Sequence, residues 1–575
     1  MRRMSTSAPL HKRAILWGTA ILTVLVVAGL CLTSESDVTA SVRQRRVERL
    51  NAAVENVYTE GYQRMADEQL AELRGEGGQG LDAMVLAENP YGTNTTSLYV
   101  YFTTDAPAKV TYTVSAEGYP DFTRTAQEGG AGGVAGTMAA SADLDGSDAY
   151  QSVHEFLVLG LIPRVSNTIT FTLEDTDGNT TERTITRQGP KLLGDEEVRL
   201  EATVAPAAGA DLGDGLYAVL GNDSDDQDFM YLYDTAGVLR GEIPLLYYRA
   251  HRLLFDGDGL MWFSASTKHL VGMNRLGKLV KIIDLGDRFI LHHDYALDAD
   301  GSIVSLATEL GRDDHAVQDQ VIKVDTRTGK VSRLLDAGEL FADYKASTTH
   351  AGIDESDPTA TGRWDWIHFN TIQLTDDGGA ILSARETSTI IKIDDLETDP
   401  TVAWMAGERS VWDGFPAIQD LFLDKDGDFP DTGGQHSVTV ETDPSLGDGR
   451  YYLTMFDNNF GYASTRPDFD WTVIDGISTA QSSKDPHSHS QFRRCLIDER
   501  AGTYAEVDAF DVPYSPYVSS EQVLDNGAIL VDSGMQGLIG TYSPDGELLA
   551  QYRMEPDISY LYRVYQYGFH GFYFQ

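Results

Sequence analysis

The sequence is poor in cysteine and in basic residues. Only Cys31 and Cys495 occur among 575 residues, which excludes a disulfide framework. Lys and Arg total 44 against 88 Asp and Glu, so the formal net charge is -44. Because a surface that binds phosphate groups needs clustered basic side chains, this balance argues against nucleic acid and anionic membrane surfaces as partners. An anionic substrate would need a local cationic pocket within a repelling field.

One long hydrophobic run lies near the N-terminus. Residues 14–33, "AILWGTAILTVLVVAGLCLT", supply about the 20 apolar residues that cross a bilayer. Four basic residues precede the run, so the positive-inside rule places the N-terminus in the cytoplasm and the rest outside. A cleavable signal peptide is the competing interpretation, but the run is long for one and has no obvious small-x-small site. We expect residues 1–35 to hold a cytoplasmic N-terminus and a single uncleaved anchor in the cell membrane, with an extracytoplasmic remainder.

Two segments separate this anchor from the main part of the chain. Residues 36–80 carry Val, Leu and Ala at helical spacing between charges and end in "GEGGQG", which predicts a helical spacer. Residues 81–190 contain short β-rich runs such as "SLYVYFTT" and "TITFTLED", separated by turn residues. This spacing predicts one β-sandwich domain of roughly 100 residues.

The remainder, residues 195–575, contains an irregular repeat. Each copy has a polar residue, an apolar residue four positions later, the glycine of an acidic turn eight positions later, and then a second apolar strand. The clearest copies are "HRLLFDGDG" from His251, "HDYALDADG" from His293, "NTIQLTDDG" from Asn370 and "SSEQVLDNG" from Ser519. "HSVTVETDPSLGDG" from His436 fits with a longer turn, and a copy with a degenerate first strand surrounds "GDGLYAVLGND". These hairpins, with further strands after each, predict an all-β chain whose main part is a six-bladed β-propeller.

The repeat register brings polar residues together. In a propeller the first residue of each inner strand lies at one mouth of the central channel, which is where sites form on this fold. His368 shares a strand face with Asn370, and Arg385 returns to the same end on the next strand. We expect eight residues at or beside this mouth: His251, His292, His293, His368, Asn370, Arg385, His436 and Ser519.

The clustered histidines have more than one interpretation. A lone histidine is more often structural than catalytic, but four blades with His at or next to one repeat position are hard to explain by chance. Neutral imidazoles also bind zinc, manganese or iron, so a metal site is the sharpest competitor. Carboxylates are lacking at the aligned positions and Arg385 would repel a cation, so we expect no metal.

Several stretches carry a family resemblance, in consistent order from about residue 82 to the C-terminus. They are "NPYGTNTTSLYVYF", "HHDYALDADG", "DWIHFNTIQL" followed by "ILSARETSTIIKID", "GGQHSV" and "YSPYVSSEQVLDNGAIL". Together they resemble the bacterial arylsulfate sulfotransferases that use no nucleotide sulfate donor. The absence of a G-x-x-x-x-G-K-[ST] phosphate loop agrees with this resemblance.

The resemblance implies a β-sandwich followed by a six-bladed propeller, and a transferase that needs neither a metal nor another cofactor. Its reaction moves a sulfuryl group from a phenolic sulfate donor to an acceptor phenol, by a ping-pong mechanism through a sulfohistidine. His436 of the "QH" motif matches the nucleophile, and His293, His368 and Arg385 match residues that act on the sulfate or the phenol. Candidates for substrate binding are Asn370, His251, Ser519 and His292.

Two other functions stay open on the sequence alone. One is a metal-dependent lyase or hydrolase that uses the histidines as ligands. The other is a non-catalytic binding propeller at the cell surface. A homodimer is one assembly that the sequence permits.

Overall fold

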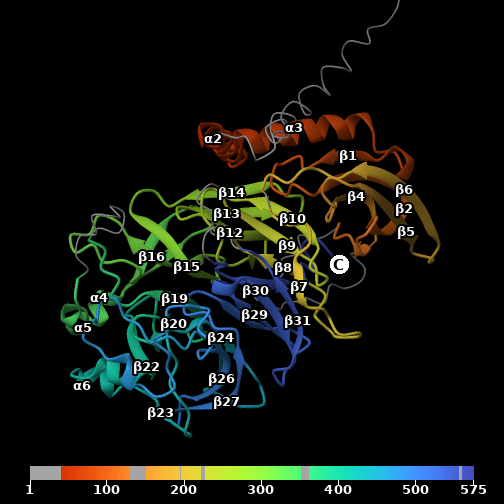
Figure 1. Ribbon diagram of the computed structural model, residues 1–575. Helices are drawn as coiled ribbons and strands as arrows, with labels where there is room; N and C mark the ends of the chain where they lie inside the picture. The colour runs from red at the N-terminus through yellow and green to blue at the C-terminus, as the bar shows by residue number, and fades with distance from the viewer. Residues whose placement is uncertain (1–39, 129–149, 195, 222–226, 351–361, 556–559) are drawn as a thin grey trace, which may run out of the picture.

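The computed structural model describes residues 40–128, 150–194, 196–221, 227–350, 362–555 and 560–575 (Figure 1). Strands predominate in these ranges, and the protein is all-β apart from two N-terminal helices and a few short helical turns. The predicted anchor at residues 14–33 lies outside the described residues. Within the described ranges, no helix has the length and apolar character needed to cross a membrane.

Two helices occupy the segment predicted to be a spacer, α2 (Ala40–Val57) and α3 (Glu60–Glu76). They do not stand apart from the body of the protein. Between them, the Tyr58 hydroxyl donates to the Pro244 carbonyl at 2.6 Å, and Leu70 of α3 is fully buried. The helices therefore cover the sheets rather than separate them from the N-terminus, as Figure 1 also shows.

The N-terminal domain is one folded sheet rather than the two separate sheets of the expected sandwich. Its strands, after the short turn η2 (Leu81–Ala83), are β1 (Val85–Glu88), β2 (Leu98–Ala116), β3 (Phe122–Thr125), β4 (Gln151–Val158), β5 (Ser166–Asp175) and β6 (Thr180–Gln188). Strand β2 pairs with β1 and β4 through its first half and with β3 and β5 through its second half. Phe156 packs against Tyr112 and Phe171 across the fold, so the shared strand links two halves that face each other.

Six further sheets of four or five strands make up the rest of the described chain. Sheet 1 contains β32 (Val564–Tyr567), β8 (Leu216–Val219), β9 (Phe229–Tyr233) and β10 (Leu239–Pro244). Sheet 2 contains β11 (Leu254–Phe255), β12 (Leu260–Ser266), β13 (His269–Asn274) and β14 (Leu279–Asp284). Sheet 3 contains β15 (Phe289–Leu297), β16 (Ile303–Glu309), β17 (Gln320–Val324) and β18 (Val331–Asp336).

The remaining three sheets have the same meander order. Sheet 4 contains β19 (Phe369–Leu374), β20 (Ala380–Ala384), β21 (Thr389–Asp394) and β22 (Thr401–Gly407). Sheet 5 contains β24 (His436–Glu441), β25 (Arg450–Asp457), β26 (Ser490–Asp498), β27 (Thr503–Val512) and β23 (Asp424–Lys425). Sheet 6 contains β28 (Ser520–Val523), β29 (Ile529–Ser533), β30 (Leu538–Tyr542), β31 (Leu548–Arg553) and β7 (Glu201–Val204).

Short helical segments lie in the connections between these strands. They are α4 (Ala337–Leu340), α5 (Ala342–Ser347), η4 (Arg409–Trp412), α6 (Pro416–Gln419), η5 (Trp471–Val473) and η6 (Gly534–Gln536). Trp366 and Trp412 are fully buried and belong to the core beneath α4 and α5.

The five clear hairpins predicted from the repeat are present as β11–β12, β15–β16, β19–β20, β24–β25 and β28–β29. Their first strands lie next to one another in sequence order, which is a propeller-like arrangement. The copy with a degenerate first strand is completed from far along the chain, because β32 pairs with β8. Strand β7, from the start of this region, likewise pairs with β31 of sheet 6.

Candidate active site

His436 is held at the start of β24 by a loop that requires glycine. A Cβ atom on Gly433 would lie 2.6 Å from the Phe460 backbone nitrogen, and Gly434 has a φ of +63°. Side chains other than hydrogen are strained at both positions. The two glycines therefore let the chain pass close to Phe460 before it presents His436.

The hydrogen bonds of His436 define its tautomer. The Nδ1 atom lies 2.7 Å from Asn458 Oδ1 and 2.9 Å from the Gly434 carbonyl oxygen. Both neighbours are acceptors, because the Asn458 amide nitrogen donates to the carbonyls of Ser515 and Val518. Nδ1 therefore carries the proton, and Nε2 keeps its lone pair.

Arg385 lies beside this loop. It follows β20, its backbone N–H donates to the His368 carbonyl at 3.1 Å, and a Cβ atom on Gly434 would lie 3.7 Å from Arg385 Cγ. Its guanidinium pairs with Glu386 and lies 3.9 Å from Asp365 Oδ2. Arg385 thus brings a cation next to the segment that carries His436.

Two further imidazoles complete the cluster. The ring centroids of His293 and His368 are 4.7 Å apart, and the Tyr562 ring stacks on His293 at 5.5 Å. His368 Nδ1 lies 2.5 Å from Asp365 Oδ2. The Nδ1–H therefore donates a hydrogen bond to the carboxylate, and Nε2 keeps its lone pair. His293 Nε2 donates to the Gln318 amide oxygen at 3.2 Å.

Several residues of this cluster have a left-handed backbone. The φ angles are +58° at His293, +58° at Gln318, +55° at His368 and +56° at Ser437. Residues other than glycine adopt this region rarely and at a cost, and such strain gathers at functional sites. Four instances around one group of side chains indicate that their orientation is under constraint.

A buried ion pair lies below the cluster. Arg563, the residue before β32, is fully buried, lies 2.9 Å from Asp294 and donates to the Asn370 carbonyl at 2.7 Å. The Asn370 side chain in turn donates to the Gln435 carbonyl at 2.8 Å. This chain of contacts connects the C-terminal strand to the residue before His436.

The surroundings keep the imidazoles neutral. Burial lowers the pKa of His436 to about 3, a hydrogen bond to Asn458 partly opposes this, and the charge of Arg385 adds to the lowering. Burial also lowers the pKa of His368 and of His293, and it raises the pKa of Asp365 to about 6. Burial lowers the pKa of Arg385, but the neighbouring carboxylates of Glu386 and Asp365 raise it by more. Arg385 therefore stays a cation.

The other predicted site residues have contacts of their own. His251 precedes β11, is fully buried, and contacts the rings of Tyr295 and Tyr562. His292 lies next to His293, with ring centroids 5.0 Å apart. The Ser519 hydroxyl donates to the Ser515 hydroxyl and accepts from the Gly534 N–H. These hydrogen bonds hold the segment before β28 in place.

The structure adds residues that the repeat did not single out. Their shared property is a direct contact with a predicted site residue, and they are Gln318, Asp365, Asn458, Tyr562 and Arg563. Asp365 stands three residues before His368 in the quoted motif, which was a usable signal. The other four lie in connections between strands, outside the repeat register.

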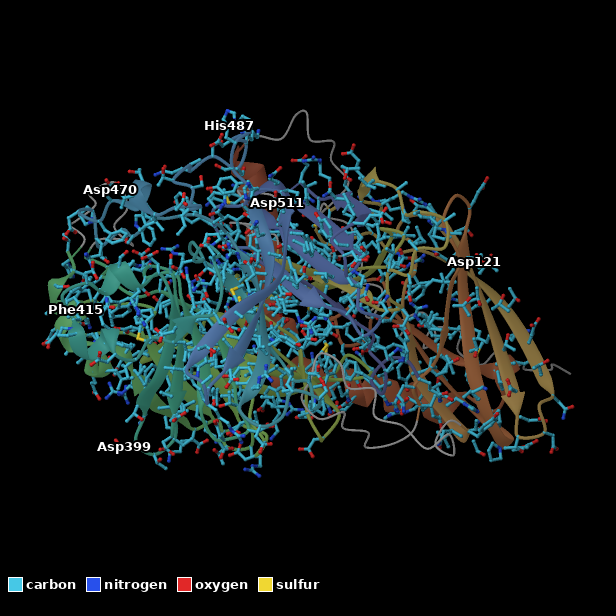
Figure 2. All side chains as sticks on the ribbon, turned by 90° about the horizontal axis from the view of Figure 1, so that it is seen from below. Asp121, Asp399, Phe415, Asp470, His487 and Asp511 are labelled. Atoms are coloured by element: carbon cyan, nitrogen blue, oxygen red, sulfur yellow. The ribbon has the colours of Figure 1, made fainter. Side chains whose placement is uncertain are left out.

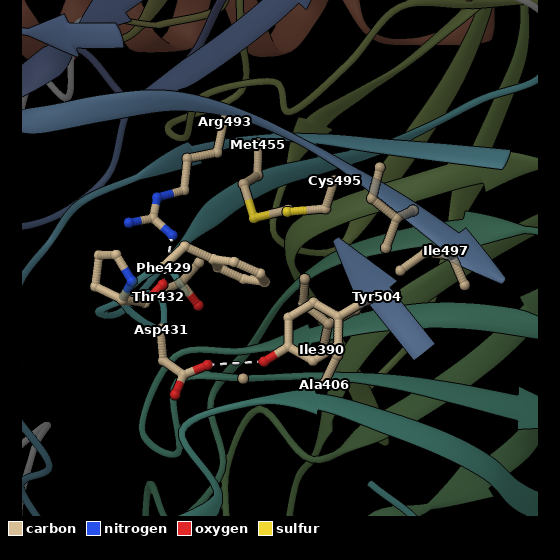
Figure 3. Close-up of a pocket in the computed structure, with 13 residues that line it drawn as sticks. Ile390, Ala406, Phe429, Asp431, Thr432, Met455, Arg493, Cys495, Ile497 and Tyr504 are labelled. Carbon is tan, nitrogen blue, oxygen red and sulfur yellow. Dashed lines mark hydrogen bonds between the residues drawn. The ribbon is translucent and has the colours of Figure 1, made fainter. Parts of the chain in front are cut away.

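A cavity lies behind the His436 loop, between sheets 4 and 5 (Figure 3). Its volume is only about 20 Å³, and Met455, Cys495 and other apolar side chains form most of its wall. Its polar members are engaged, since the Tyr504 hydroxyl donates to Asp431 and Arg493 pairs with Asp457. The cavity offers no free cation for an anionic substrate, unlike the cluster at Arg385.

The cluster contrasts with the outer surface. Figure 2 labels Asp399 and Asp470 at the edge of the view, in keeping with the excess of acidic residues in the chain. In the part of the chain that the structure describes, no group of three or more His, Cys, Asp or Glu side chains could hold a metal ion. A neutral imidazole with a free ring nitrogen beside a guanidinium is typical of enzymes that attack an anionic group.

The comparison with known families names this class of enzyme. The family model "Arylsulfotransferase (ASST)" matches residues 201–559, which is more than half of the chain. The protein therefore belongs to the arylsulfotransferase family. Membership supports sulfotransferase activity in general, and the resemblance noted in the sequence is confirmed.

Solved structures share only distant likeness with the chain. A protein of unknown function from Bacteroides caccae has 9% identity and a TM-score of 0.34, covering 62% of this chain and 99% of its own. A putative 6-phosphogluconolactonase from Bacteroides fragilis has 11% identity and a TM-score of 0.33, covering 80% and 98%. Virginiamycin B lyase from Staphylococcus aureus has 12% identity and a TM-score of 0.29, covering 62% and 89%. No curated protein matches the chain.

Proposed function

We propose that the protein is an aryl-sulfate sulfotransferase that moves a sulfuryl group from a phenolic sulfate to an acceptor phenol through a sulfohistidine at His436. The observation that carries this proposal is the His436 tautomer, because its Nδ1 faces only acceptors and its Nε2 is left as a nucleophile. A histidine whose pKa is lowered to about 3 is neutral at pH 7 and needs no separate base to attack.

The first half-reaction forms the sulfohistidine. The His436 Nε2 lone pair attacks sulfur, the bond from sulfur to the phenolic oxygen breaks, and its electron pair leaves with the phenolate. The imidazole becomes cationic, and its Nδ1–H still donates to Asn458 and Gly434, which stabilises that charge. Arg385 stabilises the sulfuryl oxygens, and the phenolate leaves as an anion that takes its proton from solvent.

The second half-reaction reverses these steps with a different phenol. The acceptor gives its proton to His368 Nε2, its oxygen attacks sulfur, and the sulfur–nitrogen bond breaks to restore neutral His436. Donor and acceptor use one site in turn, so the kinetics are ping-pong. His293, fixed by Gln318 and stacked on Tyr562, is placed to contact the same substrate groups.

The architecture that we propose for this site is a six-bladed propeller. The six sheets, with first strands in contact and with β32 and β7 completing sheets 1 and 6, support it. We further propose that residues 1–35 anchor the enzyme in the cell membrane with the remaining chain outside the cytoplasm, on the support of the apolar run and its basic flank.

One assay separates this function from its alternatives. The protein without residues 1–35 is incubated with 4-nitrophenyl sulfate, with and without phenol, in the presence of a chelator. We expect nitrophenol release that depends on phenol and survives chelation. Release that chelation abolishes would favour a metal-dependent lyase or hydrolase, and no release would leave a binding protein.

Asp365→Asn tests the proton transfer. The amide cannot stabilise a proton on His368, so we expect kcat with phenol as acceptor to fall by about 10²-fold, while single-turnover release of nitrophenol, a good leaving group, changes little. In the wild type, transfer to phenol should decline below about pH 6, where the Asp365–His368 pair becomes fully protonated. That decline should disappear in Asp365→Asn, and the exposed Asp376→Asn serves as the control.

An equal loss in both half-reactions, with an unchanged pH profile, would show that Asp365 acts only on the structure.

A further inference from the structure

Three aromatic side chains contact one another in a row that begins beside Arg385, and the proposed mechanism gives them no role. The Tyr517 ring lies with its centroid 5.9 Å from the Arg385 guanidinium carbon. Phe460 packs edge-on against Tyr517 at 5.0 Å, and the Tyr462 ring stacks on Phe460 at 5.8 Å. These three residues, which we name the aromatic wall, extend from Arg385 outward.

The aromatic wall is fixed to the residues that orient His436. Asn458, which accepts from His436, donates to the carbonyls of Ser515 and Val518 on either side of Tyr517. The Phe460 backbone N–H donates to the Gly433 carbonyl at 3.0 Å. Wall and nucleophile therefore keep a fixed relation to each other.

Exposure increases from His436 through Arg385 to Tyr462. His436 is 2% exposed, the Arg385 side chain 18% and Tyr462 39%, while Phe460 is buried between the two tyrosines. Tyr462 is thus the exposed end of a row of side chains that begins at Arg385, beside the His436 loop. A substrate that reaches His436 from this side passes the aromatic wall.

We propose that the aromatic wall binds the outer ring of donors and acceptors with two linked or fused aromatic rings, with the reacting ring beside Tyr517 and the second ring against Tyr462. This inference rests on the proposed function. Aromatic rings stack best on other flat rings, and an exposed tyrosine supplies such a surface at small conformational cost. Tyr462 is then a specificity residue that leaves the reaction of a single-ring phenol unaltered.

The test compares one-ring and two-ring ligands. Calorimetry with benzenesulfonate and biphenyl-4-sulfonate measures binding without turnover, and kcat/KM with phenol and 4-phenylphenol measures transfer. We expect the two-ring compounds to be favoured about tenfold in both measurements, and Tyr462→Ala to remove this preference while the one-ring values stay within about twofold. Tyr462→Phe should retain it.

Tyr150→Ala is the matched control, because Tyr150 is a partly buried tyrosine of the N-terminal domain with Lys109 Nζ 5.6 Å from its ring centre. A two-ring preference that persists in Tyr462→Ala would overturn the inference. So would an equal loss for one-ring and two-ring ligands. If the wild type fails to transfer sulfuryl groups, the calorimetric preference and its loss in Tyr462→Ala still decide whether the aromatic wall holds a second ring.

Discussion

His436→Ala is expected to abolish sulfuryl transfer, with kcat/KM falling by about 10⁴-fold or more. Among the described side chains of the cluster, His436 is the one whose Nδ1–H is held by two acceptors that can stabilise the cation formed when its free Nε2 attacks, so we expect no other residue to replace it as nucleophile. The measurement is nitrophenol release from 4-nitrophenyl sulfate with phenol as acceptor. His487→Ala is the control, because His487 is exposed and lies at the edge of the molecule (Figure 2).

The fold should survive this substitution, since His436 contacts its neighbours through one ring nitrogen and the loop is set by the two glycines before it. Circular dichroism and thermal unfolding would verify that. Residual phenol-dependent release above about a tenth of the wild-type rate would contradict the assignment of His436 as nucleophile.

Arg385→Ala is expected to lower kcat by about 10²–10³-fold with a smaller change in KM. The guanidinium faces charge that grows on the sulfuryl oxygens as the bond to the leaving oxygen breaks, so its contribution is larger in the transition state than in the bound substrate. Arg385→Lys keeps the charge and should recover part of the loss. The measurement is the same assay over a range of donor concentrations.

Because removal of the cation leaves Glu386 and Asp365 unbalanced, unfolding of Arg385→Ala must be followed alongside its kinetics. The exposed Arg500, paired only with Asp448 at the surface, supplies the control Arg500→Ala. A rise in KM with kcat unchanged would show that Arg385 only captures the substrate anion. An unchanged rate for Arg385→Ala would remove it from the mechanism.

The fold was predictable to the extent that local pattern determines it. The strand, acidic turn and strand of each repeat located five hairpins, because a two-residue alternation and a glycine turn carry their own geometry. The pairing of β32 with β8 was not predictable, since no local signal connects residues more than 300 positions apart. The length of β2, which joins both halves of the N-terminal sheet, was not predicted either, because the sequence pattern indicated separate short strands.

The candidate site followed the same rule. The repeat register predicted that His293, His368, Arg385 and His436 lie near one another. In the structure the His293 and His368 rings are in contact, and Arg385 lies beside Gly434. His251 contacts the Tyr562 ring that also stacks on His293, whereas the Ser519 hydroxyl is engaged by Ser515 and Gly534. Asn458 could not be found by pattern, because its role comes from hydrogen bonds to two loops distant in sequence.

Charge in this site runs against the net charge of the molecule. A chain of formal charge -44 buries Arg563 and largely buries Arg385, each with a carboxylate partner. Paired in this way, both cations remain charged in a poorly solvated place, where a charge interacts more strongly than it would at the surface. Under the proposed function, Arg385 is the cation that receives an anionic substrate in this acidic protein.

The most direct test of the account is to treat the protein with 4-nitrophenyl sulfate in the absence of any acceptor phenol, quench at alkaline pH and map the modified peptide by mass spectrometry. We predict one added sulfuryl group on the peptide that contains His436, lost on acid treatment and on addition of phenol, and absent from His436→Ala. Phenol-dependent transfer without such an adduct, or with the adduct on another residue, would contradict the account.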